Sequence, residues 1–181
     1  MGIPGIRQAI AVRTIRRRGV QTTTVSIDHV IPDSAGPRRA RWRVTSGPAR
    51  LPGSEFESAA EVNARFTEGR AIACVDIASN ATVAAIAYHI DHRKTNPVLL
   101  TDVAIRRDAS WREIGHGAVP ILKAYLHELS VKLGRDGAVG FFPPTARVAE
   151  GYIDRYGFTR AAVPSPWRRY GSIYLKQLPF D

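Results

Sequence analysis

The sequence predicts a single mixed α/β domain, and three observations carry this prediction. The chain has 181 residues, 44% of them hydrophobic, which suffices for one core but not for two independent ones. Short β-branched and apolar runs alternate with helical patterns along its length. Residues 98–105, 118–133 and 138–142 follow one another as strand, helix and strand, the order of a parallel crossover unit. We expect this domain to cover residues 20–181, preceded by a basic arm over residues 1–19 that is either loose and flexible or a short helix.

Turn residues separate the elements of the first half. Ser54 followed by Glu57 fits a capping box, which predicts a helix that begins at Ser54. Gly69 supplies the left-handed residue that ends it. Ser79 and Asn80 lie between two apolar runs, which indicates an antiparallel hairpin. The predicted elements of this half are strands over 20–31, 41–45, 71–77 and 82–90 and a helix over 54–69.

The second half contains the strongest helical periodicity. Apolar residues recur on one face from Ala118 to Leu133, which leaves Lys123 and His127 on the side expected to face solvent. Thr145 is an N-cap for a further helix, and Gly157 ends it. The predicted elements of this half are strands over 98–105, 138–142, 158–163 and 172–177 and helices over 118–133 and 145–156.

The net charge of +10 is concentrated in the first 50 residues. This part contains ten arginines and only two acidic residues, Asp28 and Asp33, whereas the rest of the chain carries a net charge of +2. Two interpretations stay open for residues 1–50. They form a solvated, disordered basic segment, or they contact nucleic acid or another acidic partner.

Other features of the composition restrict the class of protein. No run approaches the roughly 18 consecutive apolar residues of a membrane-spanning helix, and the start of the chain lacks the layout of a secretory signal. We therefore expect a cytoplasmic protein without a membrane partner. Cys74 is the single cysteine, which excludes an internal disulfide and a cysteine-based metal cluster. No metal is expected.

A glycine-rich stretch, Arg112–Gly117, precedes the long predicted helix. Gly115 and Gly117 allow a tight turn and a close approach of the backbone to a ligand. The first amides of the helix lack partners within it, so an anion is favoured there, and Arg112 adds a charged contact. Glycines in this position are also an ordinary way for a chain to enter a helix, without any ligand.

The pattern Arg112-x-x-Gly115-x-Gly117 resembles the Arg/Gln-x-x-Gly-x-Gly/Ala pattern of the GNAT superfamily of N-acetyltransferases. The resemblance covers residues 71–177 and includes Gly157-Phe158 after the last helix. It implies a central mixed sheet of about six or seven strands, mostly antiparallel with one splayed parallel pair, and helices on both faces. One departure from the family is the link over residues 106–111, which is about two residues longer than usual.

The resemblance implies an enzyme that transfers an acetyl group from acetyl-coenzyme A to an amine of a small molecule, a protein or an aminoacyl-tRNA. A backbone amide of the strand over 98–105 would polarise the thioester oxygen. The cofactor-binding residues implied are Val103, Ala104, Ile105, Arg112, Glu113, Ile114, Gly115, His116, Gly117 and Ala118.

Two residues are the candidate proton carriers. Asp102 is ionisable within an apolar strand and is either the base for the amine or a partner in a structural hydrogen bond. Many members of the family have a tyrosine that protonates the leaving thiolate at the position of Ile153, so the neighbouring Tyr152 is the candidate here. His89 and His92 are further base candidates, with a surface role as the alternative.

Several alternatives stay open from the sequence. The aromatic and basic turn over residues 167–170 is suited to an acidic or nucleotide-containing acceptor, or is merely exposed. The absence of a tyrosine at Ile153 and the charge of residues 1–50 also fit a catalytically inactive regulatory or nucleic-acid-binding module of the same fold. The acceptor is not identified, and the protein is either a monomer or a homodimer.

Overall fold

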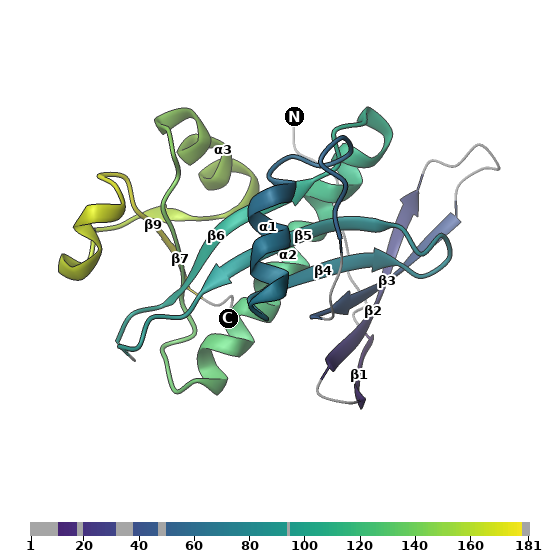
Figure 1. Ribbon diagram of the computed structural model, residues 1–181, viewed down its shortest axis with the longest axis horizontal. Coiled ribbons are helices and arrows are strands. Elements are labelled where there is room, and N and C mark those ends of the chain that lie inside the picture. The colour runs from purple at the N-terminus through teal and green to yellow at the C-terminus, as the bar shows by residue number, and fades with distance from the viewer. Residues whose placement is uncertain (1–10, 18–19, 32–37, 47–49, 94, 179–181) are drawn as a thin grey trace.

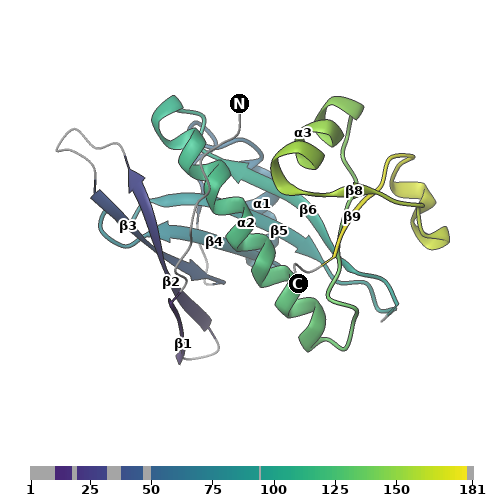
Figure 2. The same ribbon diagram turned by 180° about the vertical axis from the view of Figure 1, so that it is seen from behind.

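A computed structural model describes residues 11–17, 20–31, 38–46, 50–93 and 95–178. Within these ranges the strands form one nine-stranded sheet in the order β1-β2-β3-β4-β5-β6-β7-β9-β8. β6 and β7 are its parallel pair, and all other neighbours are antiparallel. Helix α1 lies on one face (Figure 1), and α2 crosses the other (Figure 2). The predicted fold class is thus confirmed, with more strands than the expected six or seven.

The elements have the following bounds. The strands are β1 Ala11–Arg17, β2 Val20–Ile31, β3 Arg38–Thr45, β4 Ala71–Asp76, β5 Thr82–His89, β6 Val98–Ile105, β7 Val139–Phe141, β8 Thr159–Arg160 and β9 Leu175–Gln177. The helices are α1 Ala59–Thr67, α2 Ala109–Lys132, α3 Ala146–Tyr156 and the 3-10 helix η1 Ser165–Tyr170.

The amino-terminal stretch differs from the prediction. Residues Ala11–Arg17 form β1, which pairs with β2 in an antiparallel ladder, so this stretch is neither a loose arm nor a helix. The β-branched residues Val12, Thr14 and Ile15 of this stretch favour a strand. The rest of the predicted arm, residues 1–10 and 18–19, lies outside the described residues.

Helix α1 begins five residues later than predicted, at Ala59 instead of Ser54. The backbone of residues 55–57 instead bonds to the end of β6: the Glu57 amide donates to the Ile105 carbonyl, and the Arg107 amide donates to the Glu55 carbonyl. Phe56 is buried in a β-bridge with Arg106. Because these backbone groups and the Phe56 ring are engaged by the sheet, the capping box does not form.

Two hydrophobic cores lie on the two faces of the sheet. On the α1 face, Val62 and Phe66 pack on small alanines of β4 and β5. On the α2 face, larger residues such as Ile86 and Leu122 form the bigger core, to which α3 contributes. The small alanines let α1 lie close to the sheet, and the hydrophobic burial on both faces fixes the central strands.

Two residues of α2 predicted to face solvent are buried. Lys123 is 1% exposed; its Nζ donates to the Tyr156 carbonyl at 2.6 Å and to Gln177 Oε1 at 2.5 Å. His127 is 7% exposed, with Nδ1 2.7 Å from the Gly137 carbonyl oxygen. The prediction failed because α3 and β9 contact Lys123 and the segment between α2 and β7 contacts His127. Within the described ranges, α2 and the other helices lack the combination of length and apolarity needed to cross a bilayer.

Candidate functional site

The site lies where β6 and β7 stop pairing. β6 pairs with β5 over residues 99–105, but with β7 only over residues 98–100. β7 ends at Phe141, and Pro143 and Pro144 follow shortly after. Proline has no backbone N–H to donate to a ladder, so β7 cannot accompany β6 further. Among the described residues, this edge of β6 is therefore unpaired from Thr101 until Ile105, whose carbonyl accepts from the Glu57 amide, and this open stretch fits the predicted splayed pair.

β6 also carries a β-bulge at Thr101. Asp102 pairs with Ala87 and Leu100 pairs with Tyr88, so Thr101 has no residue opposite it. A bulge bends its strand and redirects the neighbouring side chains. The Thr101 hydroxyl oxygen is buried, and no residue in the described part of the chain forms a hydrogen bond with it. Such a group is costly unless a ligand or water satisfies it.

A pocket of about 400 Å³, the α3-side pocket, opens beside this edge. Its residues come from the loop before α1, the outer half of β6, α2, the end of β7, and α3. Five residues of the predicted site line it: Asp102, Val103, Ile105, His116 and Tyr152. Its other lining residues are Glu57, Ser58, Thr101, Phe141, Pro144, Val148, Gly151, Arg155 and Tyr156.

Tyr152 projects from α3 into this pocket and stacks on Phe141, with ring centroids 4.2 Å apart. Burial raises the pKa of the Tyr152 hydroxyl well above its ordinary value, and Tyr156 and Asp102 raise it further. The hydroxyl therefore keeps its proton throughout the physiological pH range. Tyr152 and Asp102, the two predicted proton carriers, both line this pocket.

His116 and Tyr156 form a second polar pair in the same pocket. His116 Nδ1 lies 2.6 Å from the Tyr156 hydroxyl oxygen. Tyr156 is only 6% exposed, yet its hydroxyl reaches a neighbour on another helix. Residues 40 positions apart in the sequence are brought together only by the packing of α3 on α2, so no local pattern could have revealed this pair.

The glycine-rich turn predicted before the long helix does not form. Helix α2 begins at Ala109, and Asp108 caps it by accepting from the Trp111 amide. Arg112, Glu113, Ile114, Gly115, His116, Gly117 and Ala118 are all helical. Within an α-helix each amide bonds to the carbonyl four residues back, so the amides of 114–118 are not available to a phosphate. The error came from treating the two glycines as a turn. Asp108, whose short side chain caps the helix, lies seven residues before Gly115 and marks where the helix begins.

The side chains of this stretch have separate environments. A Cβ at Gly115 would lie 2.7 Å from Ile105 Cγ2 and 3.2 Å from the Val83 carbonyl oxygen, so this glycine allows α2 to contact the sheet closely. A Cβ at Gly117 would meet nothing within 4 Å. Arg112 is half exposed and pairs with Glu57 at 3.3 Å. The remaining predicted cofactor-binding residues with buried side chains pack in the two cores instead of lining the pocket: Ala104, Ile114 and Ala118.

A second pocket of about 450 Å³, the α1-side pocket, lies beyond Thr101, which borders both. Its lining residues come from α1, from the residue before β4, from the end of β5, from β6, from the residue after β7 and from η1. They are Arg65, Arg70, His89, Leu99, Leu100, Thr101, Phe142 and Tyr170. Thr101, at the bulge where β6 has no β7 partner, is therefore a lining residue of both pockets.

No protein-family model and no curated protein sequence matches the chain. Among solved structures, it is similar to the crystal structure of Ard1 from Thermoplasma volcanium. The sequence identity is 16% and the TM-score is 0.43, over 67% of this chain and 78% of the Ard1 chain. A similarity this low assigns neither a family nor an activity, so the functional conclusion depends on the geometry of the open edge of β6.

Proposed function

We propose that the protein is an acyltransferase that moves an acetyl group from acetyl-coenzyme A to an amine. The observation that carries this proposal is that two pockets share Thr101 as a lining residue, on the stretch of β6 that β7 leaves unpaired. Transfer between two substrates requires that a donor and an acceptor reach one point from different directions. The gap beside the bulge supplies that point, and the unpaired strand edge supplies backbone donors there.

The α3-side pocket suits the acyl-bearing arm of the donor. Its volume falls within the usual range for small-molecule sites, roughly 300–1,000 Å³. The phosphates would be held by guanidinium side chains, because the predicted amide cradle is helical. Arg155 lines the pocket and is exposed, and Arg112 stands beside Glu57 of the same pocket. The donor, when bound, supplies a thioester whose carbonyl carbon accepts a nucleophile.

The residues at the gap have separate tasks in this proposal. Strand amides alternate in direction, so amides within 102–105 that do not bond to β5 face the gap and would stabilise the thioester oxygen as it gains charge. Asp102 would take the proton that the nitrogen loses as the C–N bond forms. Tyr152, protonated at neutral pH, would donate to the sulfur as the C–S bond breaks. The proton on Asp102 would then restore Tyr152, so that overall one proton moves from nitrogen to sulfur.

The decisive test is a substitution on α3 that places a larger side chain in the α3-side pocket. Gly151 lines the pocket, is helical, and has no atom within 4 Å of the position of a Cβ. We expect Gly151→Leu to weaken acetyl-coenzyme A binding by more than about tenfold, because the leucine would occupy the space needed by the donor. Isothermal titration calorimetry measures the binding, and release of free thiol with a mixture of amines measures transfer.

Gly117→Leu is the matched control, since Gly117 is also helical with open space around its Cβ position but does not line the pocket. It should leave binding unchanged. Absence of binding by the unmodified protein at millimolar acetyl-coenzyme A would refute the enzyme proposal. Loss of binding in Gly117→Leu with retention in Gly151→Leu would show that the donor occupies the α2 surface instead.

The amino-terminal strands favour one alternative, a nucleic-acid-binding module. β1 and β3 both pair with β2, which brings seven arginines of the sequence into adjoining strands: Arg13, Arg16, Arg17, Arg38, Arg39, Arg41 and Arg43. Phosphate contacts of this kind give binding that weakens steeply with salt. Binding of RNA with a steep salt dependence, without acetyl-coenzyme A binding, would favour this alternative.

A further inference from the structure

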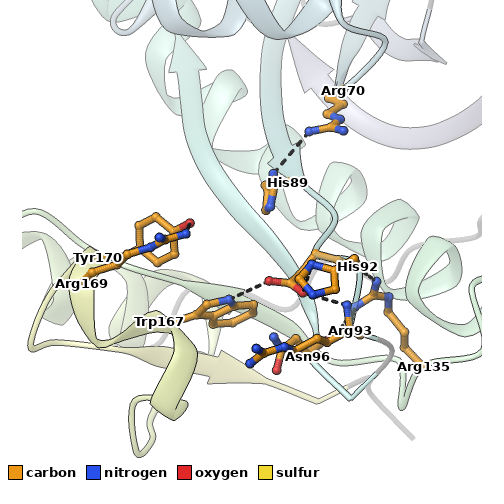
Figure 3. Close-up of polar contacts among 10 residues, drawn as sticks. Arg70, His89, His92, Arg93, Asn96, Arg135, Trp167, Arg169 and Tyr170 are labelled. Atoms are coloured by element: carbon orange, nitrogen blue, oxygen red, sulfur yellow. Dashed lines mark hydrogen bonds and ion pairs between the residues drawn. The ribbon is translucent and has the colours of Figure 1, made fainter.

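The α1-side pocket is lined by two arginines, Arg65 and Arg70, and by His89. Arg70, which directly precedes β4, and His89, at the end of β5, stand side by side, with Arg70 Nη1 3.3 Å from His89 Nδ1 (Figure 3). Across the described residues, Arg70 forms no ion pair with a carboxylate. No aspartate or glutamate is among the residues that line this pocket.

The two carboxylates that act on His89, Glu68 and Asp91, are engaged elsewhere. Glu68 pairs with Arg65 at 2.7 Å at the outer side of α1. Asp91 accepts from the Trp167 indole at 3.1 Å and from the Arg93 amide at 2.7 Å. These contacts anchor the loop after β5 to η1. In the described part of the chain, the guanidinium of Arg70 thus has no carboxylate contact and lies at the wall of a cavity, which favours an anionic ligand.

His89 presents a second donor to the same ligand. Burial lowers the pKa of His89, and Arg70 lowers it further, so the ring is neutral near pH 7. A guanidinium N–H donates to Nδ1, and a neutral imidazole then carries its proton on Nε2. His89 therefore offers an N–H donor beside the guanidinium. Its acceptor nitrogen is occupied, so His89 is suited to binding and not to taking a proton from the amine.

The rest of the lining is apolar and aromatic. Leu99 and Leu100 come from β6, and Phe142 and Tyr170 pack against each other with ring centroids 5.9 Å apart. A ligand with a carboxylate at one end and an apolar body fits these walls. A planar guanidinium matches a carboxylate in a bidentate pair.

We propose that the acceptor is an amine that also carries a free carboxylate, such as an amino acid with an apolar side chain. The carboxylate binds Arg70 and His89 Nε2, and the amine points to the gap at Thr101. The reaction of that amine rests on the proposed acyltransferase function, whereas the carboxylate contact does not.

The test compares acceptors that differ only at the carboxylate: leucine, leucinamide and 3-methylbutylamine, with the corresponding phenylalanine series. We expect kcat/KM for the free acid to exceed that for the amide by about 10- to 100-fold, the range of a charge-assisted pair. Arg70→Gln should reduce the acid to the level of the amide and leave the amide unchanged. Arg147→Gln, at an exposed position outside both pockets, is the control.

Binding measured without the donor separates this proposal from the acyltransferase function. Calorimetry should detect leucine and N-acetylleucine but not their amides, and a thermal melt checks that Arg70→Gln folds. Equal kcat/KM for acid and amide would overturn the carboxylate site while acyl transfer stands. Carboxylate-dependent binding lost in Arg70→Gln, with no transfer to any amine, would uphold the site and refute the transferase. If neither measurement shows a preference for the acid over the amide, the proposed carboxylate site is wrong. This comparison uses the unmodified protein, so it holds even if Arg70→Gln does not fold.

Discussion

The two edges of β6 differ in how far they are paired. On the β5 side a backbone ladder runs over residues 99–105, and α2 lies directly on the paired strands. On the β7 side the ladder covers only residues 98–100. There α2 and α3 are held together by a buried polar contact, in which Lys123 bonds to the Tyr156 carbonyl and to Gln177 of β9.

This difference shows how a continuous sheet can contain a site. Uninterrupted pairing satisfies every backbone group and leaves no space for a ligand. At β7 two prolines and the bulge at Thr101 interrupt the pairing, and the polar contact at Lys123 keeps α3 in place without closing the strands. The same sheet is thus rigid along one edge of β6 and open along the other.

The largest expected effect concerns the open edge. Tyr152→Phe removes the proposed proton donor but keeps the stack on Phe141, so we expect kcat to fall about 100-fold, in the range for general acid catalysis. Steady-state kinetics of thiol release measures this. Tyr174→Phe, which removes a buried hydroxyl outside both pockets, is the control. An unchanged kcat in Tyr152→Phe would exclude Tyr152 as the donor.

The next effect concerns the closed edge. Gly115→Ala places a methyl group 2.7 Å from Ile105 Cγ2, so we expect a loss of about 1–3 kcal/mol in the free energy of unfolding. Gly117→Ala, two residues further along the same helix, has open space and should gain about 0.5–1 kcal/mol from helix propensity. Urea denaturation measures both. Equal effects at the two positions would show that α2 does not contact the sheet as described.

A smaller effect, on the pH dependence of stability, tests the buried polar contact of Lys123 with Tyr156 and Gln177. Burial lowers the pKa of Lys123 from 10.5 to about 7. Between these values the unfolded chain binds a proton that the folded chain does not, so the contribution of Lys123 makes stability rise with pH above about 7 and stay level at lower pH. From pH 7 to 9 the rise should be about 2 kcal/mol.

Lys123→Met should lack this rise, which denaturation curves at several pH values would show. Lys132→Met, at an exposed position of the same helix, should keep it. An identical pH dependence in the unmodified protein and in Lys123→Met would mean that Lys123 is hydrated in the folded state.

Several parts of the fold followed from local sequence. Thr145 caps α3 by accepting from the Val148 amide, and Gly157 ends the helix with a positive φ of 69°, both as predicted. The strands over the centre of the chain and the parallel crossover also appear where expected. These features depend on capping, on glycine conformations and on hydrophobic periodicity, which act over a few residues.

The errors share one physical cause. The capping box at Ser54 was displaced because Glu55 and Glu57 bond to the end of β6, and Lys123 was buried because α3 and β9 cover it. The glycine pattern at Gly115 identified a close approach, but of α2 to the sheet and not of a backbone to a ligand. In each case a contact distant in the sequence outweighed the local preference.

The sequence by itself determined the fold class and the order of the main helices and strands from residue 20 onward, because caps and apolar spacing act locally. Asp102, Val103, Ile105, His116 and Tyr152, all predicted as site residues, line one pocket, and their roles stay a prediction. Only the tertiary structure decided that Tyr156 joins His116, that Arg70 stands beside His89, and that Thr101 lines two pockets. Those relations depend on the packing of helices and strands that lie far apart along the chain, where the balance of burial and hydrogen bonding is set by the whole fold.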